Sequence, residues 1–403
     1  MESPLVTVDN NLHEISVGGK PLLFHIPSTS IFERDALTGD ILELLRKQSL
    51  TRSQVIATMV PRYQAEDVEN AMDELGKLSL LAPTANDAVV PFQPLELDRV
   101  PLTTVVLNVN TGCNLSCTYC YKEDLDTPQN QRKMEFETAK QSIDLLLSES
   151  PDQDRYNLVF FGGEPLSNLA LIKAVIEYAE ECFSAAGKVV DFSLTTNATL
   201  LNEATIDYLN AHRVGIAVSI DGPKAYHDRN RITVGGQGTY ETVEKKVKLL
   251  LSRYNSRPVG ARVTLTTGIT DIHAIWDHLF NTLGFAEVGF APVTSGDIAE
   301  YNLRPEELSA VFDGMKRLGQ LYLDAALENR SIGFSNMHQL MTDLHEGNKK
   351  ALPCGAGVGM VAIDHAGGVN LCHRFTGSEL PLLGTVDTGI DKPALNTFLN
   401  KRL

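Results

Sequence analysis

Between residues 103 and 328 the sequence alternates apolar, strand-like segments with amphipathic helical ones. The candidate strands are residues 103–109, 157–163, 189–197, 215–221, 259–266 and 286–293. The candidate helices are residues 135–148, 168–184, 202–211, 239–254, 271–283 and 305–328. Strands that are apolar on both faces and alternate with helices are typical of a parallel sheet covered by helices. The pattern therefore predicts an α/β fold of six strand–helix units, either open or closed into a barrel.

The rest of the chain divides around this pattern. A chain of 403 residues with 43% hydrophobic residues can bury a large core and is long enough for two or three domains. We expect an N-terminal domain over 1–83, a proline-containing linker over 84–100, the alternating domain over 101–330 and an irregular, glycine-rich region over 331–403.

The N-terminal segment has the pattern of a small α+β unit. "HEISV" and "PLLFHI" surround "GGK" as in a hairpin, and helices are expected near 33–47, 51–60 and 65–78, with Thr51 as an N-cap. A hairpin with three helices resembles a winged helix, a fold that often binds DNA. The third helix, however, carries five acidic residues and one lysine, so phosphates would repel it. A peptide partner is the better expectation.

The charge and composition of the chain limit the partners and the cellular compartment that we expect for it. The formal net charge of −16 argues against nucleic acid or an anionic membrane as the main partner. We find no signal-peptide pattern and no long uninterrupted apolar run, which predicts a cytoplasmic protein. Six cysteines in a chain of this length are not a disulfide framework and point to metal or redox chemistry.

Three of the six cysteines lie close together in "CNLSCTYC", as Cys113, Cys117 and Cys120, directly after the first strand. The next three strands end in "GGEP" (162–165), "TTNATL" (195–200) and "SIDG" (219–222). The carboxyl ends of parallel strands meet at one edge, where such folds bind ligands. Three thiolates could bind zinc with a fourth ligand from elsewhere, or an iron–sulfur cluster with one open iron position.

"CNLSCTYC", including Tyr119, resembles the cluster motif of the radical S-adenosylmethionine (AdoMet) enzymes. The resemblance implies a partial (β/α)6 barrel in which Cys113, Cys117 and Cys120 ligate a [4Fe-4S] cluster whose open iron binds AdoMet. The further AdoMet contacts that it implies are Gly162, Gly163 and Glu164 for the amino group, and Asn197, Ser219 and Arg231 for the ribose and carboxylate. Turn or cap chemistry at Asn197 and Ser219, and a surface position for Arg231, are the structural alternatives.

A second cysteine pair, Cys354 and Cys372, encloses a glycine-rich stretch that resembles the start of the SPASM extension. That resemblance implies one or more auxiliary [4Fe-4S] clusters. Further cysteines of the SPASM pattern do not occur before Leu403, so we expect the chain to be truncated before them. Two structural thiols are the alternative. Cys182, on an apolar helix pattern, is expected to be a core thiol.

The order of these regions resembles the radical AdoMet enzymes that modify peptides. "LLFHIPSTSIFERDALTGDILELLR" and "NLSCTYCYKEDLDTP" look most like the maturase of quinohemoprotein amine dehydrogenase. The resemblance implies thioether crosslinks between Cys and Asp or Glu in the small subunit of the dehydrogenase. It also implies a peptide or small-protein substrate gripped by the N-terminal domain by β-augmentation, and an external flavodoxin- or ferredoxin-like electron donor.

Three other functions stay open. The chain could mature another cysteine-rich peptide, or act as a sulfatase-type formylglycine maturase. A DNA-binding iron–sulfur sensor is the alternative from a different class. The sequence identifies no catalytic base, and Arg229 and Arg262 are candidates to receive a substrate carboxylate.

Overall fold

The computed structural model describes residues 3–83, 100–121, 131–294, 299–347 and 354–402. The chain forms two compact units. One contains Met1–Pro94 and Leu340–Ala351, and the other contains Leu95–Gln339 and Leu352–Leu403. The predicted linker, 84–100, lies outside the described residues except for Val100.

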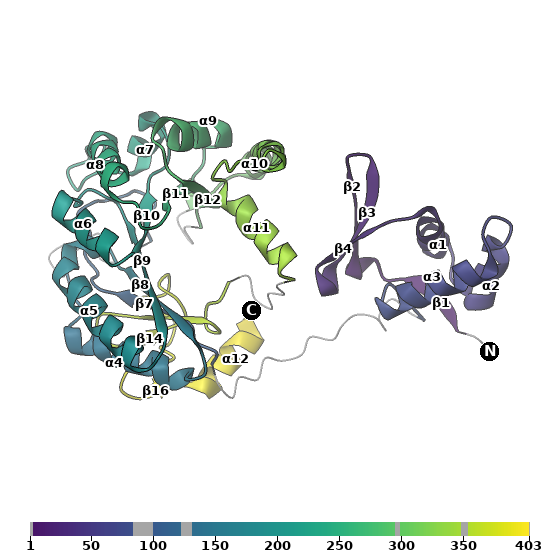
Figure 1. The fold of residues 1–403 in the computed structure, drawn as a ribbon, viewed down its shortest axis with the longest axis horizontal. Helices are drawn as coiled ribbons and strands as arrows, with labels where there is room; N and C mark the ends of the chain where they lie inside the picture. The colour runs from purple at the N-terminus through teal and green to yellow at the C-terminus, as the bar shows by residue number, and fades with distance from the viewer. Residues whose placement is uncertain (1–2, 84–99, 122–130, 295–298, 348–353, 403) are drawn as a thin grey trace. The chain divides into compact units, whose positions relative to one another are not determined.

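The N-terminal unit combines two small antiparallel sheets with three helices (Figure 1, purple and blue). One sheet is β2 (Leu12–Val17), β3 (Lys20–His25) and β4 (Ser30–Glu33), and the other is β5 (Leu50–Thr51), β1 (Pro4–Thr7) and β6 (Leu81–Ala82). The helices are α1 (Ala36–Lys47), α2 (Arg52–Met59) and α3 (Ala65–Lys77). The predicted hairpin and helices are present, and Thr51 caps α2 by accepting a hydrogen bond from the Gln54 backbone N–H at 3.3 Å.

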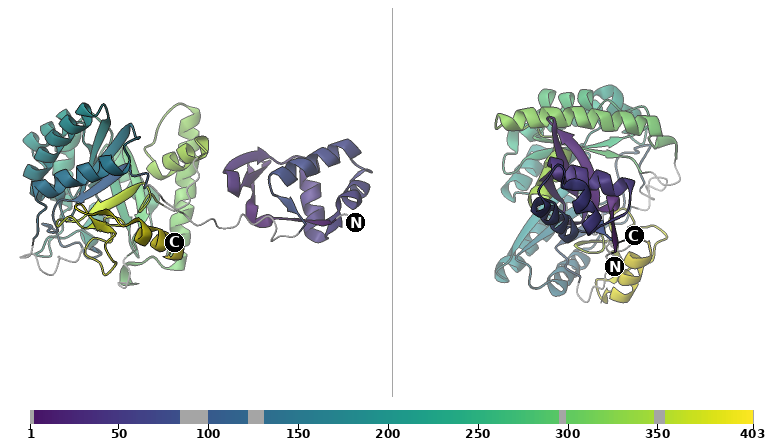
Figure 2. Two further views of the ribbon diagram at one scale, coloured as in Figure 1. Left: turned by 90° about the horizontal axis from the view of Figure 1, so that it is seen from below. Right: turned by 90° about the vertical axis from the view of Figure 1, so that its right-hand side faces the viewer.

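The second unit is built on a curved sheet with helices along its outer side (Figures 1 and 2). Six of its parallel strands lie in chain order: β7 (Thr104–Asn108), β8 (Arg155–Phe161), β9 (Val189–Thr196), β10 (Gly215–Ser219), β11 (Val259–Leu265) and β12 (Glu287–Pro292). All six predicted strands are therefore confirmed, each shifted by a few residues at its ends.

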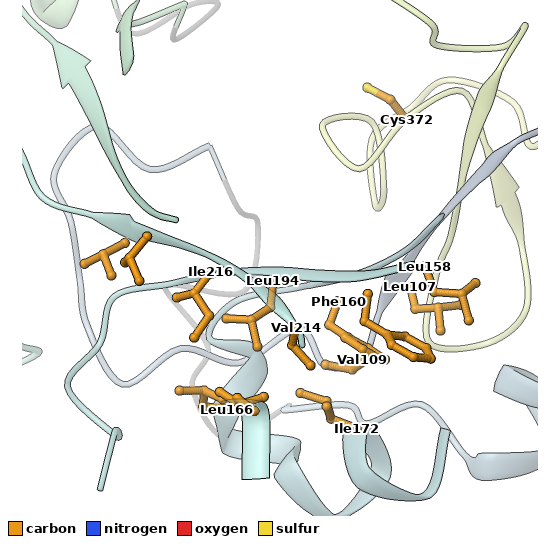
Figure 3. Packing of buried hydrophobic residues seen from close by; sticks show 14 of the residues in the cluster. Leu107, Val109, Leu158, Phe160, Leu166, Ile172, Leu194, Val214, Ile216 and Cys372 are labelled. Atoms are coloured by element: carbon orange, nitrogen blue, oxygen red, sulfur yellow. The ribbon is translucent and has the colours of Figure 1, made fainter. Parts of the chain in front are cut away.

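The helices of this unit follow the strands as the periodicity predicts. They are α4 (Phe136–Glu149), α5 (Leu169–Ala185), α6 (Glu203–Ala211), α7 (Lys224–Asn230), α8 (Tyr240–Arg253), α9 (Ile272–Asp277), which continues as a π-helical turn over His278–Thr282, α10 (Pro305–Leu327) and the first residues of α11 (Ser335–His345), a helix that belongs to the N-terminal unit from Leu340 on. Of these helices, α7 and α11 were not predicted. Apolar residues on the outer face of the sheet, such as Phe160 and Leu194, pack toward Ile172 of α5 (Figure 3).

The first part of the C-terminal segment extends the barrel sheet. Strand β13 (Met360–Ile363) pairs in parallel with β7, and β14 (Val369–Asn370) pairs antiparallel with β13. A small ribbon, β15 (Gly384–Thr385) with β16 (Gly389–Ile390), and helix α12 (Lys392–Arg402) follow. The pairing of β13 with β7 was not predicted, and it brings the residues after β14 to the edge of the barrel.

The first turn of α10 is anchored to the loop after β11 by one carboxylate, that of Glu307. It accepts hydrogen bonds from the backbone N–H groups of Gly268 at 2.7 Å and Arg304 at 2.9 Å, and from the Thr267 hydroxyl at 2.9 Å. Hydrogen bonds from Arg304, Gly268 and Thr267 lower the pKa of Glu307 to about 2. The carboxylate thereby stabilises the fold when it is ionised.

We expect Glu307→Gln to destabilise the protein by about 2 kcal/mol at neutral pH, since charge-assisted bonds are lost. The pKa of Glu307 is lower in the folded state than in the unfolded chain. Its contribution is therefore complete above the unfolded pKa and lost as the pH falls toward 2. Urea unfolding of Glu307→Gln and the exposed neighbour control Glu306→Gln, at pH 7 and pH 4, checks both statements. Equal urea midpoints of Glu307→Gln and Glu306→Gln at pH 7 would contradict the expected role of the Glu307 carboxylate.

Candidate active site

The loop after β7 carries Cys113, Cys117 and Cys120 and is held against the segment that follows α7. The backbone N–H of Ser116 donates to the carbonyl of Ile232 at 2.8 Å, and that of Thr118 donates to Asn230 at 2.9 Å. A further bond, from the Cys120 N–H to the Cys117 carbonyl at 3.0 Å, makes a tight turn between the last two cysteines. The bonds to Asn230 and Ile232, together with the turn inside the loop, thus fix the positions of the thiols.

All three cysteines line one cavity, together with residues from the ends of β8, β9 and β10. Every residue predicted from the sequence to hold the first cluster or AdoMet lies on its wall. The lining includes Cys113, Cys117, Tyr119, Cys120, Gly162, Gly163, Glu164, Asn197, Ser219 and Arg231. The sequence therefore identified residues that the fold brings together from four strand ends, although it did not identify the other lining residues Leu115, Tyr121, Phe161, Thr195 and Thr196.

Gly162 and Gly163 let the end of β8 approach the backbone that leads into Cys113. A Cβ on Gly163 would lie 2.1 Å from the Gly112 carbonyl oxygen, and Gly162 has φ +145 with its Cβ position 2.4 Å from the Asn110 oxygen. The backbone N–H of Gly163 donates to Asn110 at 3.1 Å. From the sequence we expected close approach to a ligand; the structure shows close approach to the chain's own cysteine loop.

We expect Gly163→Ala to displace the cysteine loop, because its new methyl group meets backbone atoms that cannot rotate away. The variant should lose at least about 2 kcal/mol of stability and bind iron less completely than the wild type. Thermal unfolding and iron content measure the two effects. Gly76→Ala is the control for a glycine with open space around it and no positive φ, and an equal effect there would refute the steric explanation.

Glu164 is almost fully buried, with 1% of its surface exposed. Its carboxylate accepts hydrogen bonds from the Thr196 hydroxyl at 2.7 Å, the Asn197 backbone N–H at 2.8 Å and the Leu166 N–H at 3.1 Å. Burial raises the pKa of Glu164 to about 7, while these hydrogen bonds oppose the rise. Its carboxylate therefore ties the ends of β8 and β9 together at the cavity wall.

Asn197 and Ser219 provide further polar groups on the cavity wall. The amide of Asn197 donates to the Asn114 side-chain oxygen at 3.0 Å and lies 3.8 Å from the Cys113 sulfur. Its side-chain oxygen accepts from the Thr199 N–H at 3.0 Å, so the turn chemistry considered as an alternative is also present. Ser219 ends β10 and lines the cavity.

Arg231 is not a surface residue, since only 7% of it is exposed. Its Nε donates to Asp221 at 2.9 Å, and Asp221 also accepts from the Tyr119 hydroxyl at 2.7 Å and the Thr264 N–H at 3.0 Å. The guanidinium lies 5.5 Å from the centre of the Tyr119 ring. Asp221, which is completely buried, was not identified from the sequence, although it stands inside the "SIDG" motif.

Burial makes Cys113 and Cys117 hard to ionise unless a metal binds them. Burial raises the pKa of Cys113 to about 12 and that of Cys117 to about 11, although the positive charge of Arg231 opposes the rise at Cys117. Metal coordination deprotonates such thiols. Three thiols on one wall and an open cavity beside them fit a cluster with a free coordination position.

Within the described ranges, no three or more His, Cys, Asp or Glu side chains are arranged to hold a single metal ion. A mononuclear zinc site requires its ligands to meet around one point. A four-iron cluster binds each cysteine through a different iron, so the sulfurs need only face one cavity.

Residues 107–279 match the family model described as the Radical SAM superfamily. Over this stretch, the barrel is similar to the radical SAM superfamily. Over 162 residues, the chain is 32% identical to an uncharacterized protein of Methanocaldococcus jannaschii, covering 40% of this chain and 52% of that protein. Over 153 residues, it is 30% identical to a cysteine-type anaerobic sulfatase-maturating enzyme of Clostridium perfringens, covering 37% and 40%. The chain thus matches about half or less of the length of these curated relatives.

Solved structures share the fold of the barrel and of the segments around it. The structure of anSMEcpe with bound AdoMet has a TM-score of 0.63 at 21% identity and covers 75% of this chain and 83% of that chain. The structure of Streptococcus suis SuiB bound to precursor peptide SuiA has a TM-score of 0.51 at 11% identity and covers 98% and 88%. No helix of the described residues is long and apolar enough to span a membrane.

The second cysteine pair, Cys354 and Cys372, belongs to the C-terminal segment of the chain. Cys372 is buried and Cys354 is exposed, and the charge on Cys354 raises the pKa of Cys372 in addition to the larger effect of burial. Figure 3 shows Cys372 on the other side of the sheet from Ile172 of α5. The turn after Cys372 reaches the cavity, because the His373 ring lies 4.3 Å from that of Phe161.

Cys182, and the two arginines expected to bind a substrate carboxylate, Arg229 and Arg262, lie in three different places. Cys182 lies half-buried on α5, so the expectation of a core thiol was wrong: its position falls between the buried stripe and the solvent face. Arg229 lines a surface pocket with Glu300 and Tyr301, separate from the cysteine cavity. Arg262 lies on the inner face of the sheet, in an open groove beside that cavity.

Proposed function

We propose that this protein is a radical SAM enzyme that modifies a peptide or small protein after its synthesis. The observation that carries the proposal is the single cavity where the cysteine loop meets the glycine, asparagine and serine residues of three further strand ends. The family match over residues 107–279 supports it independently. In this proposal Cys113, Cys117 and Cys120 hold a [4Fe-4S] cluster, and the cavity receives AdoMet.

When bound, the cluster and AdoMet together supply a 5′-deoxyadenosyl radical that can take hydrogen from an unactivated carbon. The protein's own residues place and shield the reacting groups. Glu164 keeps the ends of β8 and β9 together, and Asn197 and Ser219 offer hydrogen bonds to the polar parts of the nucleoside and amino acid. The guanidinium of Arg231 supplies positive charge beside Cys117 and is the proposed partner of the AdoMet carboxylate.

For the substrate we favour the small subunit of quinohemoprotein amine dehydrogenase, with thioether crosslinks between Cys and Asp or Glu. The supporting observations are the sequence resemblance and the N-terminal unit, whose acidic helix α3 does not suit DNA. Each crosslink would remove two hydrogens from the peptide: one would go to the adenosyl radical, and the other would leave as a proton, its electron passing to an auxiliary iron–sulfur cluster. Cys354 and Cys372 are the proposed residues for that cluster, and a flavodoxin- or ferredoxin-like protein is the proposed donor to the first cluster.

A sulfatase-type activity is the second candidate, because the sulfatase-maturating enzyme of Clostridium perfringens is 30% identical over the matched residues. That activity converts a cysteine or serine into formylglycine, which carries an aldehyde. The two candidates therefore leave different products on a peptide.

Mass spectrometry of two peptides separates them. The reconstituted enzyme, AdoMet and a strong reductant are incubated with a small-subunit peptide containing Cys and Asp or Glu, and in parallel with a sulfatase peptide containing the modified cysteine. Loss of two hydrogens with a carbon–sulfur crosslink in the first peptide supports the favoured substrate class. A hydrazide-reactive aldehyde in the second peptide, with the first unchanged, would replace it with sulfatase maturation.

A further inference from the structure

We propose that Arg262 and Arg374 form a subsite, beside the cysteine cavity, that receives a carboxylate side chain of the substrate. The inference rests on the proposed function, which it deepens by naming the chemical class of group that the substrate presents. Both arginines lie in the unit that contains the barrel, and both belong to the described residues.

Arg262 occupies the middle of β11 on the inner face of the sheet. Its neighbours Ala261 and Val263 are buried, whereas Arg262 is exposed, so its side chain lies on the face opposite to theirs. Arg262 pairs in register with Ser219, which lines the cysteine cavity. Arg262 itself lines the adjoining open groove of about 380 Å³, together with Asn336 and Gln339. It therefore stands between the proposed AdoMet cavity and the open groove.

Arg374 approaches the same place from the C-terminal segment. Its guanidinium carbon lies 5.0 Å from the centre of the Tyr121 ring, and Tyr121 lines the cysteine cavity. Arg374 therefore lies against Tyr121 and Arg262 is the strand neighbour of Ser219, and both Tyr121 and Ser219 line the cysteine cavity. Arg374 reaches the cavity because β13 pairs with β7 and so brings the C-terminal segment to this edge of the barrel sheet.

Neither cation is neutralised by a carboxylate within the described residues. Several, though not all, of the other arginines of the barrel have such partners, as Arg231 has Asp221 and Arg253 has Asp207. Glu287 lines the same groove as Arg262, but no ion pair joins them in the described part of the chain. In a protein with 51 acidic and 35 basic residues, two uncompensated guanidinium groups at one cavity mouth favour an anion that arrives with the substrate.

A carboxylate is the group that a guanidinium binds best through two parallel hydrogen bonds. Arg231 lies deeper, with its Nε already bonded to Asp221, so the AdoMet carboxylate and a substrate carboxylate have separate candidate partners. An Asp or Glu side chain held by Arg262 and Arg374 would place its methylene carbons at the mouth of the cavity.

The test measures how fast each arginine reacts with phenylglyoxal in the cluster-loaded enzyme with AdoMet present throughout. The probe is N-acetyl-glutamic acid α-amide, and N-acetyl-glutamine amide is its uncharged counterpart. We expect the acid, at about twice its dissociation constant, to slow labelling of Arg262 and Arg374 about threefold, because only unoccupied sites react. The amide should have no effect, and Arg317, an exposed arginine on α10, should label equally in all samples.

A variant pair makes the assignment specific. In Arg262→Gln, the acid should no longer protect Arg374, while in the control Arg317→Gln the protection should remain. Equal protection by the amide, or no protection by the acid, would overturn the proposal. Formation of 5′-deoxyadenosine by the wild type is scored separately, so protection without deoxyadenosine would reject the proposed function and leave the anion subsite standing.

Discussion

Replacing Cys117 with alanine is expected to remove the iron–sulfur cluster and to reduce 5′-deoxyadenosine formation to the background of cluster-free protein. Cys117 is the middle thiol of the loop, and the Cys120 N–H turns back onto its carbonyl at 3.0 Å, so no other described cysteine can take its place without moving the loop. Two remaining thiols leave two irons of the cluster without protein ligands. Iron and sulfide content, visible absorption and deoxyadenosine by mass spectrometry measure the effect.

The matched control is Cys182→Ala. Cys182 is half-buried on α5 and is absent from the cavity lining, so this variant should keep its cluster and its activity. A Cys117→Ala protein that keeps a full cluster, or a Cys182→Ala protein that loses it, would show that the cysteine loop is not the cluster site.

The second large effect is expected at Asp221. Replacing it with asparagine leaves the guanidinium of Arg231 buried without its anionic partner and weakens the hydrogen bond from Tyr119. Breaking a buried ion pair by removing one partner costs about 3–5 kcal/mol. We expect Asp221→Asn to lose stability in this range and to take up less iron, because Tyr119 lies between two of the cysteines. Urea unfolding and iron content are the measurements.

The double variant Asp221→Asn/Arg231→Met separates the ion pair from general damage to the loop. Once the unpaired charge is gone, part of the lost stability should return, and the double-mutant cycle should show a coupling of at least about 1 kcal/mol. Additive losses in the cycle would mean that the two side chains do not stabilise each other.

The sequence predicted the barrel well because its signal is local. Strands such as β8 and β9 are short apolar segments followed by amphipathic helices, and their parallel order follows from that alternation. The pairing of β13 with β7 joins Val361 to Val105, which are far apart in the sequence, and β13 has only four residues. A short strand that pairs with a distant edge leaves no periodic signal.

Much of the candidate site was also predictable from the sequence, again because its signals are local. Motifs at strand ends are visible in the sequence, and parallel strands bring them to one edge, so Gly163 and Asn197 were correctly expected near Cys113. Asp221 was missed, since its importance depends on the burial of Arg231 and on the Tyr119 hydroxyl, which come from other parts of the chain. Arg374 was missed because only the pairing of β13 brings it to Tyr121.

Anaerobic incubation of the reconstituted protein with AdoMet and a strong reductant tests most directly whether the cysteine cavity generates a radical. We expect 5′-deoxyadenosine and methionine to accumulate in the wild type and to be absent when AdoMet, reductant or Cys117 is removed. A fully loaded, reduced cluster that binds AdoMet and yields no deoxyadenosine would contradict the proposed function.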